Sequence, residues 1–289
     1  MHPPGFHANV SADERDKTMS QLSHTTGCAA LALALLAAPV FADEAAAGRD
    51  VLTKNQNAVV AVKLVITLTQ RGAGGQENKN ESKGETIGTV IDPSGLTLVS
   101  LATTDPGALM AKTMKSRGFE LKSEVTDLKI VLPDGTELPA KIVLRDNDLD
   151  MAFLRPVDKP AKPMAAIDLS KDAKPVVLDD LVVLGRLGEI AGRVPSLALS
   201  HVRAIIEKPR TFYVLRQDGT EIGSPVFAQD GKIVGVILIR STDSSGASQQ
   251  GLMTVVLPSA DIAEAAKQAP DVEKKKAAES KPEKTEPAK

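Results

Sequence analysis

Short runs of apolar and β-branched residues, separated by turn residues, recur along most of this chain. The first run, Val59–Thr69 (VVAVKLVITLT), has the composition of a β-strand. The turn residues Pro93-Ser94-Gly95 and Asp134-Gly135 each separate two such runs, so each predicts a β-hairpin. The polar segment Arg71–Glu85, which contains several glycines, predicts a loop. The strands expected in this first half are Val59–Thr69, Thr86–Asp92, Leu96–Leu101, Leu128–Leu132, Glu137–Leu144 and Asp150–Arg155.

The same pattern resumes after a linker rich in proline and lysine, Pro156–Pro163. Pairs of turn residues at Asp218-Gly219 and Asp230-Gly231 again separate the apolar runs. The pattern alone indicates an all-β protein, built either as two small antiparallel barrels or as a sandwich. We expect the two domains at residues 43–160 and 161–268. The second-half strands are expected at Val176–Leu184, Leu197–Glu207, Thr211–Arg216, Ser224–Ala228, Lys232–Arg240 and Leu252–Leu257.

Helical composition is confined to a few short segments. Residues 44–57 predict a short helix or a lead-in to the first strand. Residues 259–268 predict a helix for which Ser259 is the expected N-cap. Residues 105–120 form an insert of helical composition, which would either pack on the first domain or cover a neighbouring cleft. Residues 269–289 are charged and contain almost no apolar side chains, so a disordered tail is expected there.

An apolar stretch near the N-terminus, Gly27–Ala42 (GCAALALALLAAPVFA), is typical of a secretory signal. It is shorter than the ~20 apolar residues that a membrane-spanning helix requires. Small residues precede Asp43, so we expect cleavage near Ala42 and export to the periplasm or the exterior. Met1 and Met19 both remain candidate starts. The alternative interpretation of the apolar stretch is that it forms a buried helix or an uncleaved membrane anchor.

Cleavage after Ala42 would remove most of the histidine side chains and the single cysteine of the chain. His2, His7, His24 and Cys28 would leave with the signal, and His201 would be the one remaining imidazole. That inventory excludes a disulfide framework, a thiol nucleophile and a histidine-based metal site in the mature protein, and we expect no cofactor.

The amino-acid composition argues against several further classes of function. The 35 basic and 37 acidic residues nearly balance, so nucleic acid is not an expected partner. Aromatic residues make up 2% of the chain, which argues against stacking platforms for bases. A mean hydropathy of −0.07 excludes a polytopic membrane protein, and no stable membrane span is expected after cleavage. The oligomeric state cannot be deduced from these numbers.

Three stretches, taken in order, resemble the trypsin-like serine proteases of the HtrA/Deg branch. They are residues 88–104 (GTVIDPSGLTLVSLATT), 131–154 (VLPDGTELPAKIVLRDNDLDMAFL) and 218–236 (DGTEIGSPVFAQDGKIVGV). This resemblance implies two six-stranded antiparallel barrels followed by a short C-terminal helix. It runs to about Lys267, so the PDZ domain that often follows in this family is not expected.

Aligned residue by residue, the resemblance places the catalytic triad on a degenerate set. The histidine position falls on Ala102, the aspartate position on Asp150, and the serine position on Ile222. Only the acid is retained, and Asp150 could instead have a structural role. The oxyanion-hole positions fall on Thr220 and Ile222. Ser224, outside the aligned triad, is the candidate nucleophile of a rearranged site.

We therefore interpret the sequence as an exported protease homologue without catalytic activity. The resemblance implies that it binds extended polypeptide or a protein partner by strand addition along the second barrel, at Leu197–Arg203 and Ala228–Arg240. One alternative is an active serine endopeptidase of the quality-control type with a rearranged site. Another is a structural subunit of the cell envelope, tethered by the charged tail.

Overall fold

The computed structural model describes residues 40–72, 74–107, 118–216, 221–241 and 252–271. The chain divides into two compact units, Met1–Asp43 and Glu44–Lys289, and the second contains every described strand. Most of the expected signal sequence, most of the 105–120 insert and nearly all of the expected tail lie outside the described residues. In the part of the chain that is described, no helix combines the length and apolarity needed to cross a membrane.

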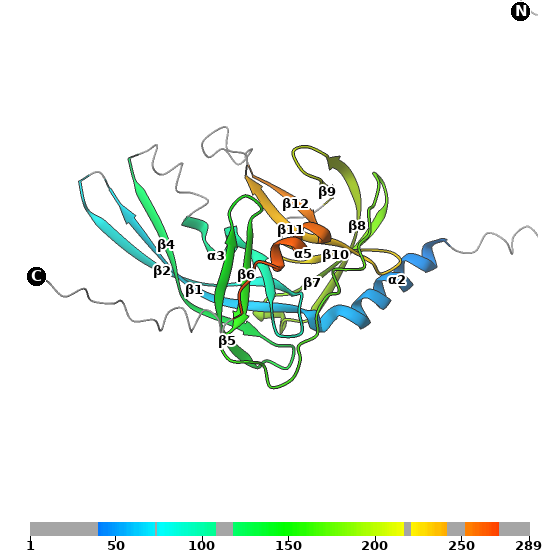
Figure 1. The fold of residues 1–289 in the computed structure, drawn as a ribbon, viewed down its shortest axis with the longest axis horizontal. Coiled ribbons are helices and arrows are strands. Elements are labelled where there is room, and N and C mark those ends of the chain that lie inside the picture. Colours follow the sequence, from blue (N-terminus) through cyan, green and yellow to red (C-terminus); the bar gives the residue numbers. More distant parts are fainter. Residues whose placement is uncertain (1–39, 73, 108–117, 217–220, 242–251, 272–289) are drawn as a thin grey trace, which may run out of the picture. The chain divides into compact units, whose positions relative to one another are not determined.

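Six strands of the first half close into an antiparallel barrel in the order β1-β2-β3-β6-β5-β4 (Figure 1). Every second side chain of β1, from Val60 to Ile66, faces the barrel core, where Ile130 and Leu154 also lie. This alternation is the period-two pattern of a strand that has one buried face. The strands are β1 Val59–Arg71, β2 Glu77–Val90, β3 Thr97–Ser100, β4 Glu120–Val131, β5 Glu137–Asp146 and β6 Met151–Pro156.

A second antiparallel barrel has the strand order β10-β11-β12-β9-β8-β7. The core of this barrel contains Val183, Val202, Val226 and Ile237. The expected fold class, two six-stranded antiparallel barrels of the trypsin-like type, is confirmed. The strands are β7 Asp180–Arg186, β8 Pro195–Ile206, β9 Phe212–Leu215, β10 Pro225–Ala228, β11 Ile233–Ser241 and β12 Leu252–Pro258.

The helices other than α2 are short, and one sequence prediction about them was wrong. Ser259 does not cap the last helix but is its first helical residue, with a buried side chain. Pro258 occupies the cap position, and it forms no side-chain capping hydrogen bond. The described helices are α2 Val40–Asn55, η1 Gln56–Ala58, α3 Leu101–Thr104, η2 Glu189–Ala191 and α5 Ser259–Ala266.

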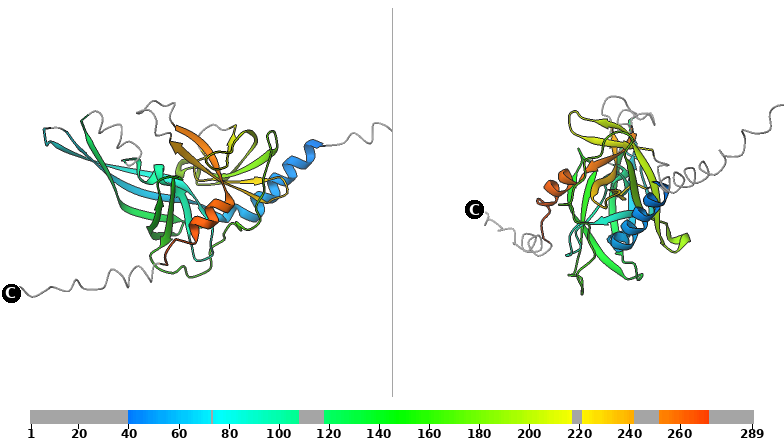
Figure 2. Two further views of the ribbon diagram at one scale, coloured as in Figure 1. Left: turned by 45° about the horizontal axis from the view of Figure 1, so that its top comes forward. Right: turned by 90° about the vertical axis from the view of Figure 1, so that its right-hand side faces the viewer.

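The polar segment that the sequence predicted as a loop, Arg71–Glu85, is mostly strand. β2 pairs with β1 in one unbroken register, from Val59 opposite Thr89 to Arg71 opposite Glu77. The ladder to β1 supplies the backbone hydrogen bonds that residues of low strand propensity would not secure alone. Residues 65–71, 77–84 and 120–126 of β1, β2 and β4 thus form a three-stranded extension, which we call the arm (Figures 1 and 2).

The two barrels share a hydrophobic core. Leu98 of β3 and Phe153 of β6 pack in one cluster with Leu238 of β11, Leu257 of β12 and Ile262 of α5. All five side chains are buried. Burial of apolar surface between the barrels therefore contributes to holding them together.

Polar contacts add to this junction at β7. The guanidinium of Arg186 donates hydrogen bonds to the carbonyl oxygens of Gln56 and Val59, each at 2.7 Å, and to that of Arg193 at 2.6 Å. Burial lowers the pKa of Arg186 below its usual value. The start of β1 is thereby fastened to a strand of the second barrel.

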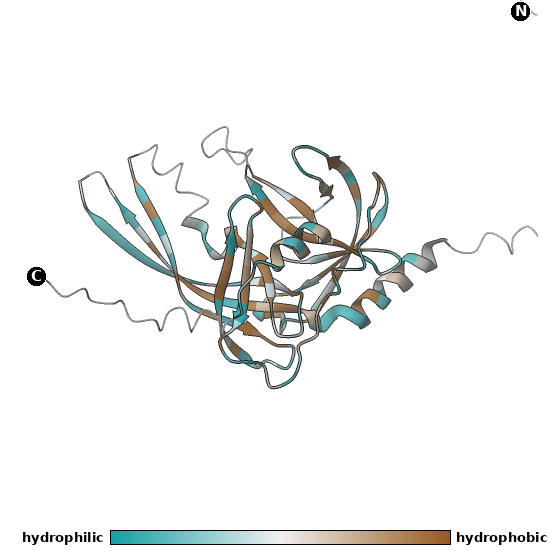
Figure 3. Ribbon diagram, viewed as in Figure 1, coloured by the Kyte–Doolittle hydropathy of each residue, from teal (hydrophilic) through white to brown (hydrophobic). Residues whose placement is uncertain are grey.

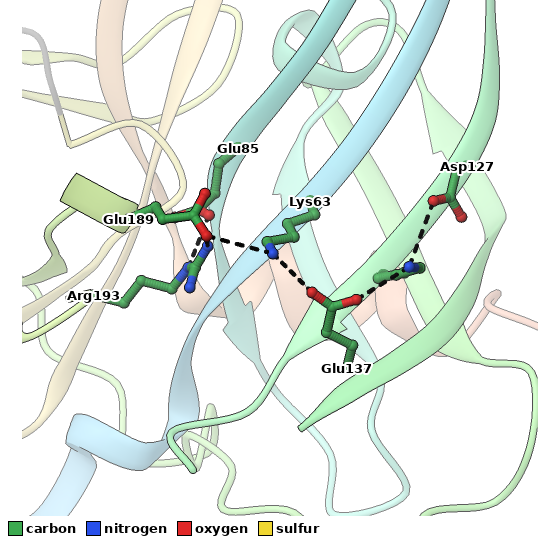
Figure 4. A network of polar contacts seen from close by, with 7 residues as sticks. Lys63, Glu85, Asp127, Glu137, Glu189 and Arg193 are labelled. Atoms are coloured by element: carbon green, nitrogen blue, oxygen red, sulfur yellow. Dashed lines mark hydrogen bonds and ion pairs between the residues drawn. The ribbon is translucent and has the colours of Figure 1, made fainter. Parts of the chain in front are cut away.

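A network of ion pairs covers the outside of the same junction (Figure 4). Arg193 pairs at 2.8 Å with both Glu85 and Glu189, and Lys63 pairs at 2.7 Å with Glu137. Hydrogen bonds from Lys63 and Lys129 lower the pKa of Glu137 to about 2. Lys63, Glu137 and Glu189 are partly or largely exposed, so their ion pairs contribute little to stability, whereas the pair between Arg193 and Glu85 is more buried.

Candidate functional site

The position expected for a catalytic base lies in α3, directly after β3. Ala102 is half-buried there, and its side chain is a methyl group. The one imidazole among the described residues, His201, lies on β8 of the second barrel, opposite Asp180 of β7. The structure thus places His201 in a β-ladder and not on α3.

The carboxylate of Asp150 is the centre of the hydrogen-bonding at this site. Its Oδ2 accepts hydrogen bonds from Ser100 Oγ at 2.5 Å and from the backbone N–H of Ile239 at 2.8 Å. Its Oδ1 accepts one from the N–H of Ala102 at 2.7 Å. Ser100 and Ala102 belong to the first barrel and Ile239 to β11, so the carboxylate joins the two barrels.

The backbone of Asp150 is in an uncommon conformation. Its φ of +57° lies in the left-handed region, and its carbonyl oxygen accepts a hydrogen bond from the N–H of Leu101 at 2.9 Å. Aspartate is one of the few non-glycine residues that tolerate this region. The backbone strain and the side-chain bonds both serve to hold the carboxylate under α3.

Burial raises the pKa of Asp150, and the hydrogen bonds from Ser100, Ile239 and Ala102 oppose that rise. The folded protein therefore binds this proton more tightly than the unfolded chain does. The contribution of this group to stability is complete below the unfolded pKa and decreases as pH rises through the folded value.

The position expected for the nucleophile lies just before β10. Ile222 is half-buried and has an aliphatic side chain. The next residue, Gly223, is buried with a φ of +92°, and its carbonyl oxygen accepts a hydrogen bond from Thr89 Oγ1 at 2.7 Å. A Cβ on Gly223 would lie 2.1 Å from the carbonyl oxygen of Ile87. Thr220, the other oxyanion-hole position, lies outside the described residues.

A family model for the trypsin-like peptidase domain matches residues 88–236, a range that contains Ala102, Asp150 and Ile222. The chain belongs to the trypsin-like peptidase domain family. No curated protein sequence matches it significantly.

Two solved structures of an HtrA-type protease, AlgWS227A, are similar to this trypsin-like domain, and the complex with a decapeptide has the same fold. The complex with a decapeptide is 16% identical with a TM-score of 0.50, and the match covers 76% of this chain and 65% of that one. The complex with a tripeptide is also 16% identical, with a TM-score of 0.48 and coverage of 76% and 62%. This chain therefore spans less than two thirds of the length of those proteins.

Ser224 of the trypsin-like domain lies in its interior. The side chain is fully buried, and its Oγ has no hydrogen-bond partner among the residues that the structure describes. β7 lies close to this hydroxyl, since a Cβ on Gly185 would be 3.6 Å from its oxygen. A buried hydroxyl without a base or a route to solvent is not placed to attack a substrate.

Replacing Ser224 with alanine should leave the free energy of unfolding unchanged or raise it, by up to about 1 kcal/mol, because an unpaired buried hydroxyl is lost. Urea unfolding monitored by circular dichroism would measure this. Ser200→Ala is the matched control: its buried Oγ donates to the carbonyl oxygen of Arg216 at 2.7 Å, so a loss of about 1 kcal/mol is expected. A larger loss for Ser224→Ala than for Ser200→Ala would contradict the assignment.

The strand edge expected to receive polypeptide is only partly open. In the segment Ala228–Arg240, β11 pairs with β12 from Gly235 onward but with β10 only between Ile233 and Val236, and the N–H of Ile239 is bound to Asp150. Polypeptide binding at this segment stays a prediction. In the segment Leu197–Arg203, β8 pairs with β7 throughout the first residues, whereas its ladder with β9 begins only at Val202.

Sequence reasoning found Asp150 and missed its partners. Ser100 is a fully buried polar residue at the end of β3, and a buried hydroxyl of this kind signals a hydrogen bond but not its partner. The N–H groups of Ala102 and Ile239 leave no side-chain signature in the sequence, and nothing near Thr89 in the sequence points to the carbonyl oxygen of Gly223, 134 residues away. In the described residues, no group of three or more His, Cys, Asp or Glu is arranged to hold a metal ion.

Proposed function

We propose that this trypsin-like domain does not cleave its ligands and instead binds an extended polypeptide or a protein partner. The observation that supports this proposal is the engagement of the one retained acid. Asp150 accepts hydrogen bonds from Ser100, Ala102 and Ile239, and in this way it joins the barrels. A catalytic aspartate would use one of these acceptor positions to orient an imidazole.

The chemistry of acyl transfer adds to this argument. Attack on a peptide bond requires a nucleophile and a base within hydrogen-bond reach of it. The methyl group of Ala102 and the sec-butyl group of Ile222 can neither donate nor accept a proton. Ser224 is buried, and the His201 position lies in the β7–β8 ladder.

The open part of β8 is the binding surface that we propose. His201 accepts a backbone hydrogen bond from Arg216 on the β9 side, and Val202 donates to Asp179 on the β7 side. By strand alternation, Leu197 and Leu199 direct their N–H and C=O groups away from β7, toward an edge that no described strand pairs with. The side chain of Leu199 is 56% exposed, which offers an apolar contact beside that edge.

The cleavage half of the proposal is tested by incubating unfolded β-casein with purified Asp43–Lys289. We expect no turnover above buffer, with active trypsin as the positive control. The same assay on Ser224→Ala identifies any rearranged site. Turnover that disappears in Ser224→Ala would overturn the proposal in favour of a serine endopeptidase.

The binding half is tested by measuring β-casein binding to two variants at one position. Leu199→Pro removes an outward N–H while sparing the β7 ladder, so we expect at least about tenfold weaker binding. Leu199→Ala keeps the N–H and loses only the exposed side chain, so binding should fall less. Equal affinity of wild type and Leu199→Pro would exclude strand addition at this edge.

Export belongs to the same proposal. It rests on the apolar stretch that ends at Ala42, followed by Asp43. N-terminal sequencing of the protein recovered from the periplasm of an expressing bacterium should begin at Asp43. An intact N-terminus on cytoplasmic protein would exclude it.

A further inference from the structure

The outer edge of β2 in the arm has no neighbour in the part of the chain that the structure describes. β2 is paired with β3 only at Thr89 and Val90, and residues 77–84 are all exposed. Figures 1 and 3 show this stretch as the outermost strand of the arm, hydrophilic along its length. An edge of this kind is a ready template for another strand.

The direction of the free backbone groups on this edge follows from the hydrogen bonds at its base. The N–H of Ile91 donates to the carbonyl oxygen of Leu96, on the β3 side of the strand. The register between β1 and β2 is unbroken from Thr89 to Glu77, so alternation continues without a bulge. The odd-numbered residues of β2 therefore direct their N–H and C=O groups outward.

Those odd-numbered residues alternate strictly in charge. In order they are Glu77, Lys79, Glu81, Lys83 and Glu85, and they share one face of the sheet. Side chains directly opposite one another across two antiparallel strands interact, favourably for opposite charges and unfavourably for like charges.

We propose that two copies of this chain associate by antiparallel pairing of their β2 edges, with Asn80 of one copy opposite Asn80 of the other. In this register Glu77 lies opposite Lys83 of the second copy and Lys79 lies opposite Glu81. Each pair occurs twice by symmetry, so all charged residues from 77 to 83 face an opposite charge. The arms then form one continuous sheet across the two-fold axis.

Neighbouring registers are less favourable. Placing Glu81 opposite Glu81 brings Lys79 opposite Lys83, and like charges then face each other along the edge. Placing Ser82 opposite Ser82 restores opposite charges but requires Glu85, which already pairs with Arg193 at 2.8 Å. The register centred on Asn80 uses only exposed residues and leaves that ion pair intact.

The charges within the arm are available for this pairing. Glu81 and Lys83 form no ion pair with any described residue, whereas Glu77 contacts Arg71 at 3.0 Å and Lys79 at 3.2 Å. The association combines about eight backbone hydrogen bonds with exposed ion pairs. It should therefore be weakened when salt is raised from about 0.1 M to about 1 M, where the Debye length is about 3 Å.

Sedimentation equilibrium of the full chain and its charge variants tests the proposal. Lys79→Glu/Lys83→Glu makes the edge uniformly acidic, and Glu77→Lys/Glu81→Lys makes it uniformly basic. Each alone should dimerise at least about tenfold more weakly than wild type, and an equimolar mixture should recover the dimer. Lys122→Glu/Lys141→Glu, with the same change in net charge away from β2, should behave as wild type.

A variant that changes the backbone tests whether the dimer depends on strand pairing at the β2 edge or only on attraction between charges. Glu81→Pro removes an outward N–H and leaves the ladder to β1 intact, so the fold should persist while the dimer is lost. A wild-type chain that stays monomeric at high micromolar concentration would overturn the proposal. So would a dimer that neither Glu81→Pro nor the charge variants weaken.

Disulfide crosslinking tests the register. In a Cys28→Ser background, which removes the single native cysteine, Asn80→Cys should crosslink to its copy under mild oxidation. Ser82→Cys should crosslink much less. Preferential crosslinking of Ser82→Cys, or of neither position, would overturn the proposed register.

Discussion

Gly223→Ala is expected to prevent this protein from folding stably. The added Cβ would lie 2.1 Å from the carbonyl oxygen of Ile87, which is backbone of the first barrel and cannot rotate away. The φ of +92° adds a conformational cost for any residue with a Cβ. We expect a loss of about 4 kcal/mol or more, close to the whole stability of many domains. Urea unfolding and the yield of soluble protein would measure it.

Gly231→Ala is the matched control. Gly231 has a φ of +80°, but a Cβ there would meet nothing within 4 Å. It therefore isolates the conformational cost, which we expect to be about 1 kcal/mol. Similar losses for Gly223→Ala and Gly231→Ala would show that the barrels can move apart to accept the methyl group, contrary to the close approach seen here.

The second large effect is expected for Asp150→Ala. The substitution leaves the hydroxyl of Ser100 and the N–H groups of Ala102 and Ile239 without their acceptor. Each unsatisfied buried donor is costly, so we expect a loss of about 3 kcal/mol or more. The midpoint of urea unfolding would measure it.

Two further variants define the origin of that loss. Asp150→Asn retains one acceptor oxygen but presents an NH₂ group to a backbone donor, so it should be intermediate. Asp148→Ala, on the same turn and exposed, should change stability by less than about 0.5 kcal/mol. Equal stability of wild type and Asp150→Ala would refute the role of this carboxylate in joining the barrels.

Much of the fold could be predicted because its strands have a strong local signature. The β-branched run of β1 and the Asp134-Gly135 turn each specify their structure within a few residues. The outer part of β2 has no such signature, because its polar residues become a strand only through the ladder to β1. Pairing between strands is a tertiary effect, and local propensity does not report it.

In the candidate site, too, some residues could be predicted from the sequence and others could not. A motif with fixed spacing located Asp150 and the aligned positions Ala102 and Ile222. The donors to Asp150 come from residues 48 to 89 positions away, and two of them are backbone N–H groups that any residue except proline could supply. The sequence offers Ser224 as the candidate nucleophile of a rearranged site, whereas the fold buries its side chain completely. The burial of a residue depends on the packing of strands that are distant in sequence, so the residues next to Ser224 in the sequence do not predict it.

The shared core between the barrels has a consequence for the order of folding during synthesis. Leu98 and Phe153 of the first barrel are covered by Leu238, Leu257 and Ile262. Until the ribosome has released the chain past α5, the cover over that apolar face is incomplete, and the exposed surface can bind chaperones or aggregate. The last helix is therefore the final element to complete the core that the barrels share.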